Sequence, residues 1–281
     1  MTVPQNSRLL LIDGHALIYR AFHAMNSVLA VSKTGEPVSA VLGFTSTLIK
    51  SITDIQPSHI AVAFDLPGPT IRSEIYPAYK AQRPPMPDEL RQQLSRIREV
   101  VEKFGISIYE SPGYEADDVL GTLAQQADAH GMHTTILSLD SDLFQLVKPS
   151  VHVLVYQSRQ GNKLYDEAQV KARYGLDPIQ VIDLKALQGD ASDNIPGVPG
   201  IGVKSATTLL QEYSTVESIY DNLDLVTPPR VQRLLREGEA GARLGKELTT
   251  IVTDIPVTLD SDDVAWQGFD RSTLLPLFEE L

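Results

Sequence analysis

The stretch Pro112–Leu120, which reads Pro-Gly-Tyr-Glu-Ala-Asp-Asp-Val-Leu, guides the interpretation of the whole chain. A Pro-Gly pair opens it, and three carboxylates, Glu115, Asp117 and Asp118, then precede an apolar run. This order predicts a helix whose first turn carries the acids. The positive end of the helix dipole favours negative side chains at that place. An acidic first turn can be an ordinary helix cap, so its meaning depends on the other acids of the chain.

Further acidic residues follow apolar runs that are typical of buried strands. Three such runs end in acids, and a later Gly-Asp-Ala-Ser-Asp-Asn segment adds two more. Ligands of an open parallel sheet bind beyond the carboxyl ends of its strands. We therefore expect these acids to converge on one crevice. The candidate set is Asp13, Asp65, Glu115, Asp117, Asp118, Asp140, Asp142, Asp190 and Asp193.

So many carboxylates in one crevice require counter-charges. Two unit charges about 4 Å apart repel by roughly 4 kcal/mol at an effective dielectric near 20. The net stability of a protein is only about 5–15 kcal/mol. The chain has no cysteine, and these motifs contain no histidine ligand set, so the donors are oxygen atoms. Oxygen donors favour Mg²⁺ or Mn²⁺ over Zn²⁺ or copper.

Composition indicates an ordinary soluble protein. The chain has 281 residues, of which 42% are hydrophobic and 21% charged, and its formal net charge is −12. No apolar run approaches the roughly 20 residues of a membrane helix, and the first residues do not resemble a signal peptide. We expect a cytoplasmic monomer without a membrane partner. The negative charge argues against a basic nucleic-acid-binding face, but it does not exclude one, because many acids are already assigned to the crevice.

The first part of the chain alternates between predicted strands and helices. This alternation predicts an α/β fold with a mostly parallel sheet flanked by helices. A proline-rich stretch between Leu66 and Pro87 carries basic and tyrosine side chains, and an amphipathic helix is predicted at 88–104. The expected strands lie at 8–12, 59–64, 106–109, 133–139 and 151–156. The expected later helices lie at 167–174, 178–187, 205–213, 216–223 and 229–246.

A glycine-rich segment, Gly197–Ala206, lies between two of these helices. It differs from a phosphate loop because Val203 separates the last glycine from Lys204. A helix–hairpin–helix turn fits better, since its glycines allow backbone N–H groups to approach a DNA phosphate. Such contacts position a duplex without reading its sequence. The alternative is a tight connection between helices that binds no ligand.

Taken together, these motifs resemble the 5′→3′ exonuclease domain of bacterial DNA polymerase I, within the flap endonuclease superfamily. The matching segments include Ile12–His15, Pro112–Asp118, Asp140–Asp142 and Gly189–Lys204, with Lys33–Pro37 as a further match. The resemblance implies a PIN-like core at 1–170 with a helical arch at about 66–104. It also implies a helical DNA-binding lobe at 171–260. A final segment, 261–281, would lead toward a polymerase region.

The resemblance also implies an activity and a set of site residues. It implies 5′→3′ exonuclease and 5′-flap endonuclease cleavage of DNA with two Mg²⁺ ions, held by the acid set, with Mn²⁺ as a substitute. It further implies a K⁺ ion held by carbonyl groups of the 197–202 turn, and work at the bacterial nucleoid during primer removal and repair. Lys80 and Arg83 are candidates to hold the scissile phosphate, and Tyr79 is a candidate to stack on an unpaired base. The candidate DNA contacts are Arg20, Arg72, Tyr79, Lys80, Arg83, Gly197, Gly200, Gly202 and Lys204.

Other classes of protein explain only part of this pattern. A haloacid dehalogenase phosphatase needs a second Asp two residues after the first, where this chain has His15. A non-catalytic DNA-binding module would explain the hairpin but not the acids. An RNA-cleaving PIN domain would share the acids but would need neither arch nor hairpin. A solvated basic loop remains the alternative reading of Lys80 and Arg83.

Overall fold

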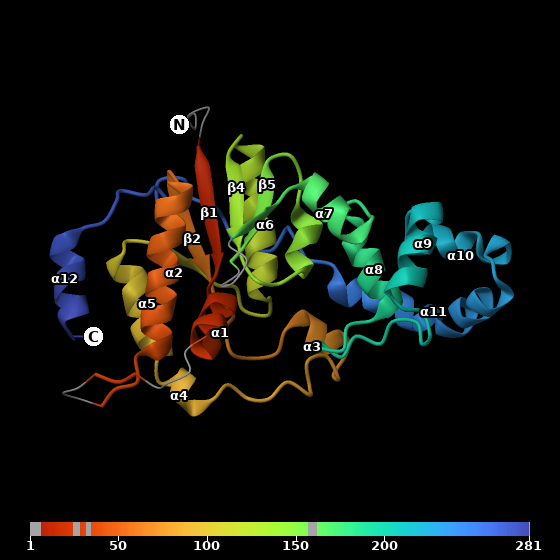
Figure 1. Cartoon of the computed structure of the whole chain (residues 1–281), viewed down its shortest axis with the longest axis horizontal. Coiled ribbons are helices and arrows are strands. Elements are labelled where there is room, and N and C mark those ends of the chain that lie inside the picture. The colour runs from red at the N-terminus through yellow and green to blue at the C-terminus, as the bar shows by residue number, and fades with distance from the viewer. Residues whose placement is uncertain (1–6, 25–28, 32–34, 157–161, 281) are drawn as a thin grey trace.

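The computed structural model describes residues 7–24, 29–31, 35–156 and 162–280. Its centre is one six-stranded sheet with the order β3-β2-β1-β4-β5-β6 (Figure 1). All neighbouring strands are parallel except the edge strand β6, which is antiparallel to β5 and was not predicted. The mostly parallel sheet predicted from the sequence is confirmed. The strands are β1 (Arg8–Asp13), β2 (His59–Ala63), β3 (Ser107–Tyr109), β4 (His133–Leu137), β5 (Val151–Val155) and β6 (Lys163–Tyr165).

Helices cover both faces of this sheet because successive side chains of β1 point to opposite sides. Leu9 and Leu11 belong to the same apolar cluster as α6 (Ala116–Ala129). Leu10 and Ile12 belong to the cluster on the other face. That cluster takes its helical side chains from α1 (Gly14–Ala24), α2 (Ser39–Ile55), α4 (Asp88–Arg91), α5 (Leu94–Lys103) and α12 (Arg271–Glu280).

A helical lobe extends from the sheet on the side away from α12 (Figure 1). It has its own apolar core, to which Leu187 of α8, Leu210 of α9 and Leu235 of α11 contribute. The lobe therefore has a separate source of stability, although α8 also contacts the sheet side of the molecule through the turn η1 (Asp142–Leu146). Its helices are α8 (Gln180–Gln188), α9 (Val203–Tyr213), α10 (Val216–Asp221) and α11 (Pro229–Thr249), with the short turn η2 (Leu223–Leu225). The preceding helix α7 (Glu167–Tyr174) contacts β6, and its buried Val170 belongs to the apolar cluster of the sheet.

The arch segment is less helical than predicted. Between 66 and 87 its one helix is α3 (Ile71–Ile75), because prolines lack the N–H group that a helix interior needs. The helix predicted at 88–104 is divided into α4 (Asp88–Arg91) and α5. Gln93 lies at the break, buried, and its side-chain oxygen accepts a hydrogen bond of 2.8 Å from the backbone N–H of Ala40.

Some sequence predictions fall on residues without a described position. Apolar spacing through Leu17, Ile18, Phe22 and Met25 predicts a helix after the first strand, and Met25 lies outside the described residues. So do Lys33 and Thr34 of the matching segment Lys33–Pro37, and Leu281 of the predicted final segment. Among the helices that are described, none has the length and apolar character needed to cross a lipid bilayer.

Candidate active site

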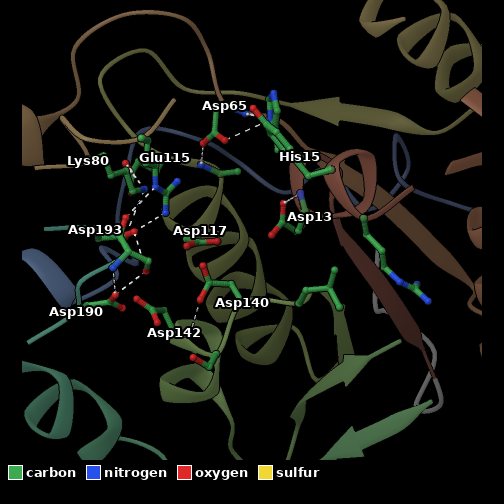
Figure 2. A pocket seen from close by; sticks show the side chains of 18 of the residues that line it. Asp13, His15, Asp65, Lys80, Glu115, Asp117, Asp140, Asp142, Asp190 and Asp193 are labelled. Atoms are coloured by element: carbon green, nitrogen blue, oxygen red, sulfur yellow. Dashed lines mark hydrogen bonds and ion pairs between the residues drawn. The ribbon is translucent and has the colours of Figure 1, made fainter. Parts of the chain in front are cut away.

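Eight of the nine candidate carboxylates line one cavity of about 670 Å³ at the carboxyl edge of the sheet (Figure 2). They come from the ends of strands β1, β2 and β4, from the start of α6 and from the loop after α8. The strand topology brings them together, as the sequence predicted. The eight are Asp13, Asp65, Glu115, Asp117, Asp140, Asp142, Asp190 and Asp193.

Four of these acids, which we call the bare carboxylates, form no ion pair with any described Lys or Arg: Asp13, Asp65, Asp117 and Asp140. Backbone and hydroxyl donors orient three of them, Asp13, Asp65 and Asp140, instead. Asp13 accepts hydrogen bonds from the Ala16 N–H at 3.0 Å and from the Ser138 hydroxyl at 2.7 Å. The Ala116 N–H donates to Asp65 at 2.7 Å. Ser138 was missed by the sequence reasoning, because a lone serine at the end of a strand carries no distinctive signal.

Two of the bare carboxylates, Asp13 and Asp117, hold protons more tightly than ordinary acids. Burial raises the pKa of Asp13 to about 6, and the charges of Asp65 and Asp140 act in the same direction. Burial also raises the pKa of Asp117 well above its usual value, reinforced by the charges of Asp140 and Asp13. An anion that is this difficult to form without a partner is well suited to accept a cation.

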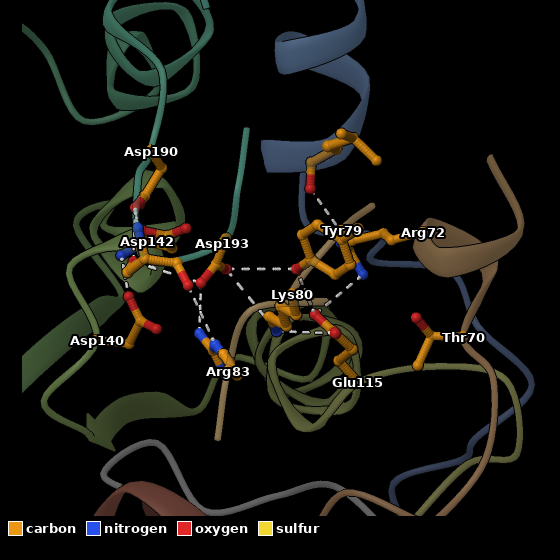
Figure 3. Close-up of polar contacts among 12 residues, drawn as sticks. Thr70, Arg72, Tyr79, Lys80, Arg83, Glu115, Asp140, Asp142, Asp190 and Asp193 are labelled. Atoms are coloured by element: carbon orange, nitrogen blue, oxygen red, sulfur yellow. Dashed lines mark hydrogen bonds and ion pairs between the residues drawn. The ribbon is translucent and has the colours of Figure 1, made fainter. Parts of the chain in front are cut away.

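The other four acids, which we call the paired carboxylates, contact basic side chains of the protein: Glu115, Asp142, Asp190 and Asp193 (Figure 3). Lys80 Nζ lies 2.8 Å from Glu115 Oε1 and 3.8 Å from Asp193 Oδ2. Arg83 also pairs with Asp193. Although burial alone would lower the pKa of Lys80, the charges of Glu115 and Asp193 raise it. The arch therefore places its two candidate phosphate-binding cations on acids of the cavity.

Lys185 completes this paired set, and the sequence reasoning missed it. Its Nζ contacts Asp142 and lies 2.8 Å from Asp190 Oδ2. Although burial would raise the pKa of Asp190, hydrogen bonds from Lys185 and Ser192 hold it below its usual value. The sequence did contain a signal for Lys185, because this lysine lies within a largely apolar helical run that is buried in α8. A lysine at such a position needs a charged partner.

Three predicted site residues have different surroundings from those expected. Arg72 is buried, and its two terminal nitrogens donate to Asp118 at 2.7 and 2.8 Å. Asp118 is fully buried and does not line the cavity, so here it is a structural partner of Arg72 and not an available ligand. Tyr79 is also buried, and its hydroxyl donates to Glu115 at 3.0 Å. Its ring is therefore not free to stack on a base in this structure.

The Arg72–Asp118 pair joins distant parts of the chain. The Arg72 Nε group donates to the Leu248 carbonyl at 2.8 Å, and a terminal nitrogen donates to the Thr250 carbonyl at 2.7 Å. Asp118 accepts from the backbone N–H groups of Glu115 at 3.0 Å and Val252 at 2.9 Å. Every charged group of the pair is thus compensated, which is the condition for burying an ion pair. The pair fixes the start of α6 relative to the end of α11.

The loop after α8 folds back on itself and carries Asp190 and Asp193. Asp190 and Ile195 exchange backbone hydrogen bonds of 3.0 and 2.8 Å. Gly197 has a φ of 58°, and a Cβ there would lie 2.2 Å from the Gly189 nitrogen. Glycine is therefore required at 197 by close backbone approach.

The remaining predicted DNA contacts lie in two places. Gly200 and Gly202 follow in the same loop, and Gly202 and Lys204 are exposed at the start of α9. Arg20 is on α1, where it lines the cavity with its guanidinium 5.4 Å from the Tyr156 ring centre. The structure thus puts Arg20 beside the acids and Lys204 on the helical lobe.

The cavity has the donor chemistry expected for a hard divalent cation. Its acids offer oxygen atoms alone, and the bare carboxylates have no lysine or arginine partner in the described part of the chain, although His15 Nδ1 lies 3.3 Å from Asp65. As placed, no group of three His, Cys, Asp or Glu side chains among the described residues is arranged to hold a metal ion. Mg²⁺ keeps several of its waters and requires few direct carboxylates. The residues therefore fit a hydrated cation better than a cage made of protein ligands.

Family models cover nearly all of the chain. The model described as the N-terminal resolvase-like domain of 5′-3′ exonuclease matches residues 8–175, and the C-terminal SAM fold of 5′-3′ exonuclease matches residues 176–272. The chain belongs to the 5′-3′ exonuclease family. It is therefore a nuclease, and the cavity at the carboxyl edge of its sheet is the candidate place of hydrolysis.

Individual relatives agree with this family. DNA polymerase I of Chloroflexus aurantiacus is 46% identical over 277 residues, which is 97% of this chain but 29% of that protein. The chain thus spans less than a third of the length of this relative. Among solved structures, T5 5′-exonuclease with bound zinc has a TM-score of 0.73 at 24% identity, covering 97% of both chains. A bacteriophage T5 flap endonuclease complex with DNA and metal ions has a TM-score of 0.72 at 24% identity, covering 97% of this chain and 98% of that one. At these identities the structural likeness concerns the fold.

Proposed function

We propose that the chain is a structure-specific 5′ nuclease that hydrolyses DNA phosphodiesters, as a 5′→3′ exonuclease and as a 5′-flap endonuclease. The observation that carries this proposal is the convergence of eight carboxylates on one cavity that also contains Lys80, Arg83 and Lys185. Family membership supports the reaction class. The solved complex of the T5 flap endonuclease with DNA and metal ions supports the choice of DNA as substrate.

Two Mg²⁺ ions, with Mn²⁺ able to substitute, are the proposed cofactors. Such ions supply an activated water and stabilise charge on the phosphate and the leaving oxygen. The residues that would hold them are the eight carboxylates of the cavity, directly or through water. Asp118 is left out of this set because Arg72 occupies both of its oxygens.

The basic side chains of the arch have a proposed role at the substrate. Lys80 and Arg83 are placed to hold the scissile phosphate, because they already reach the acids that would surround the reaction. Arg guanidinium groups and lysine ammonium groups form strong charge-assisted hydrogen bonds to phosphate oxygens. Arg20, which also lines the cavity, is the proposed further contact to the cleaved strand.

The hairpin loop is the proposed duplex contact. Gly197 and Gly200 lie in the loop before α9, and Gly202 and Lys204 lie at the start of the helix, where backbone N–H groups and the helix dipole favour phosphate. A K⁺ ion held by carbonyl groups of the 197–202 turn belongs to this proposal. So do a monomeric state, a linked polymerase region, and a role in primer removal and repair. The relatives that are DNA polymerases support the last two.

The decisive experiment is incubation of the protein with a 5′-labelled DNA flap in Mg²⁺ or EDTA. We expect Mg²⁺-dependent release of short labelled products and new 5′-phosphate ends. Binding of the flap without cleavage would indicate a non-catalytic DNA-binding module. Cleavage of single-stranded RNA with no cleavage of the flap would indicate a PIN-type ribonuclease. Either result would overturn the proposal.

A further inference from the structure

Lys185 has an unusual position for a lysine. It lies in the buried part of α8, its side chain is 11% exposed, and its ammonium group points into the acid cavity. There it bridges Asp142, at the start of η1, and Asp190, in the loop after α8. Ion pairs on a protein surface contribute little, but a bridge in a partly enclosed cavity neutralises two carboxylates that would otherwise repel each other.

The two carboxylates bridged by Lys185 are also proposed ligands of a divalent cation. An ammonium group and a divalent cation have charges of the same sign, and they compete for the same oxygen atoms. Both cannot contact Asp142 and Asp190 closely at the same time without strong repulsion. The lysine stem has four flexible carbons, so the ammonium group can leave the carboxylates without a backbone movement.

We propose that Lys185 is a resident counter-cation, which neutralises Asp142 and Asp190 in the metal-free protein and is displaced when a divalent cation binds. This inference rests on the proposed function, because it takes the cavity to be a metal site. It makes Lys185 a competitor of the metal and not a ligand-positioning residue. Metal binding at the paired carboxylates is then an exchange of one cation for another, whereas the bare carboxylates accept a cation without such an exchange.

The chain contains a matched control for this lysine. Lys246 of α11 also bridges two carboxylates, with its Nζ 2.8 Å from Asp183 and 2.5 Å from Glu217. Those residues lie in the helical lobe and do not line the cavity. A lysine-to-methionine change at 246 thus removes the same charge and the same kind of bridge, but away from the proposed metal site.

The first experiment measures Ca²⁺ and Mg²⁺ binding to the whole chain by calorimetry without DNA. We expect Lys185→Met to tighten divalent binding at least about tenfold, equivalent to ~1.4 kcal/mol. Lys185→Arg keeps the competing charge, and Lys246→Met changes a distant bridge, so both are expected to bind like the parent protein. Weaker binding in Lys185→Met would show that the lysine supports the metal site and would overturn the proposal.

The second experiment uses the unaltered protein and therefore does not depend on the folding of a variant. Reductive methylation with formaldehyde, followed by mass spectrometry of peptides, reports how accessible each ammonium group is. We expect Lys185 to be protected in EDTA and to react several times faster in Ca²⁺, while Lys246 reacts equally in both. Divalent binding with Lys185 still protected would reject the displacement but leave the nuclease proposal intact. Absence of any divalent binding would reject the proposed cofactor itself.

Discussion

The bare and the paired carboxylates line the same cavity but solve the problem of charge repulsion in different ways. Burial and neighbouring charge raise the pKa values of Asp13 and Asp117, whereas Lys185 and Ser192 lower that of Asp190. The bare acids end strands or start α6, and the paired acids face the arch and α8. The difference teaches that charge repulsion is not compensated equally among the acids of this cavity when no metal is bound. The bare carboxylates have no lysine or arginine partner among the described residues, whereas the paired carboxylates already contact one.

The largest expected effect comes from removing one of the bare carboxylates. Asp117→Ala removes a carboxylate that faces both Asp13 and Asp140, and we expect at least about a hundredfold loss of Mg²⁺-dependent flap cleavage. Single-turnover cleavage of a 5′ flap measures this loss, with circular dichroism to check the fold. Asp128→Ala, which breaks an ion pair with Lys148 outside the cavity, is the control and is expected to cleave normally. Near-normal cleavage by Asp117→Ala would contradict the two-metal assignment.

The next effect concerns the basic side chains that contact the paired carboxylates. Lys80→Ala removes the cation that bridges Glu115 and Asp193. We expect single-turnover cleavage to fall by about two orders of magnitude, with little change in duplex affinity. Lys204→Ala, at the exposed start of α9, is expected to weaken duplex binding instead. Equal losses of cleavage and binding in Lys80→Ala would place Lys80 among general backbone contacts.

A smaller effect distinguishes neutralisation of the cavity from ordinary salt screening. Monovalent salt weakens DNA binding because cations compete for phosphates. Millimolar Ca²⁺ also neutralises the bare carboxylates, so we expect flap affinity to rise several-fold relative to EDTA at matched ionic strength. Fluorescence anisotropy with a labelled flap measures both effects. The Asp117→Ala protein has less repulsion to relieve and is expected to gain less. Weaker binding in Ca²⁺ than in EDTA would mean that the acids do not face the DNA.

The smallest effect is on the stability of the metal-free protein. Removing a bare carboxylate and removing a paired carboxylate are expected to change the free energy of unfolding in opposite directions. Asp117→Ala removes an uncompensated acid and is expected to raise the free energy of unfolding by about 1 kcal/mol. Asp190→Ala leaves Lys185 with Asp142 as its one remaining carboxylate partner among the described residues. This change is expected to lower the free energy of unfolding. Urea unfolding in EDTA measures both changes. A change of the same sign in both variants would contradict the division of the acids into bare and paired carboxylates.

The sign of the pH dependence follows from the direction of the Asp117 shift. Its folded pKa is raised, so the folded state binds protons more readily than the unfolded state. The destabilising effect of Asp117 is therefore complete above the folded pKa and disappears as the pH falls toward the ordinary range of carboxyl groups. We expect the stability gain of Asp117→Ala to grow as the pH rises toward the folded pKa of Asp117, and to vanish under acidic conditions.

Sequence patterns predicted the sheet and the convergence of acids because both depend on local periodicity and on strand topology. Asp13 and Asp140 follow apolar runs, and parallel pairing of β1 with β4 then brings them to one edge. The Asp118 side chain could not be assigned in this way. Asp117 and Asp118 are adjacent in sequence, but the helical twist directs one into the cavity and the other toward Arg72. Which neighbour faces the cavity depends on long-range packing with α3 and the end of α11.

The break at Gln93 has the same origin. The amphipathic pattern at 88–104 is continuous, and nothing local predicts that a glutamine side chain will be buried against the backbone at the start of α2. The Lys185 bridge likewise joins residues 43 positions apart in sequence. Contacts of this kind arise from the tertiary structure, and spacing along a single sequence does not contain them.

The positions of Arg72 and Gln93 have a consequence for how the arch can move. Both are buried and hydrogen-bonded to backbone groups of other segments, so they act as fixed attachment points at the two ends of a strap. Between them, Tyr76–Pro87 could extend to at most about 40 Å of contour length. Lifting Lys80 away from the acids requires a change in the curvature of the strap. It also requires Tyr79 to leave its buried place beside Ile195 and Leu248, and the hydrogen bond of 2.9 Å from the Lys80 N–H to the Asp193 carbonyl to break. The length of the strap sets the upper limit of such an opening.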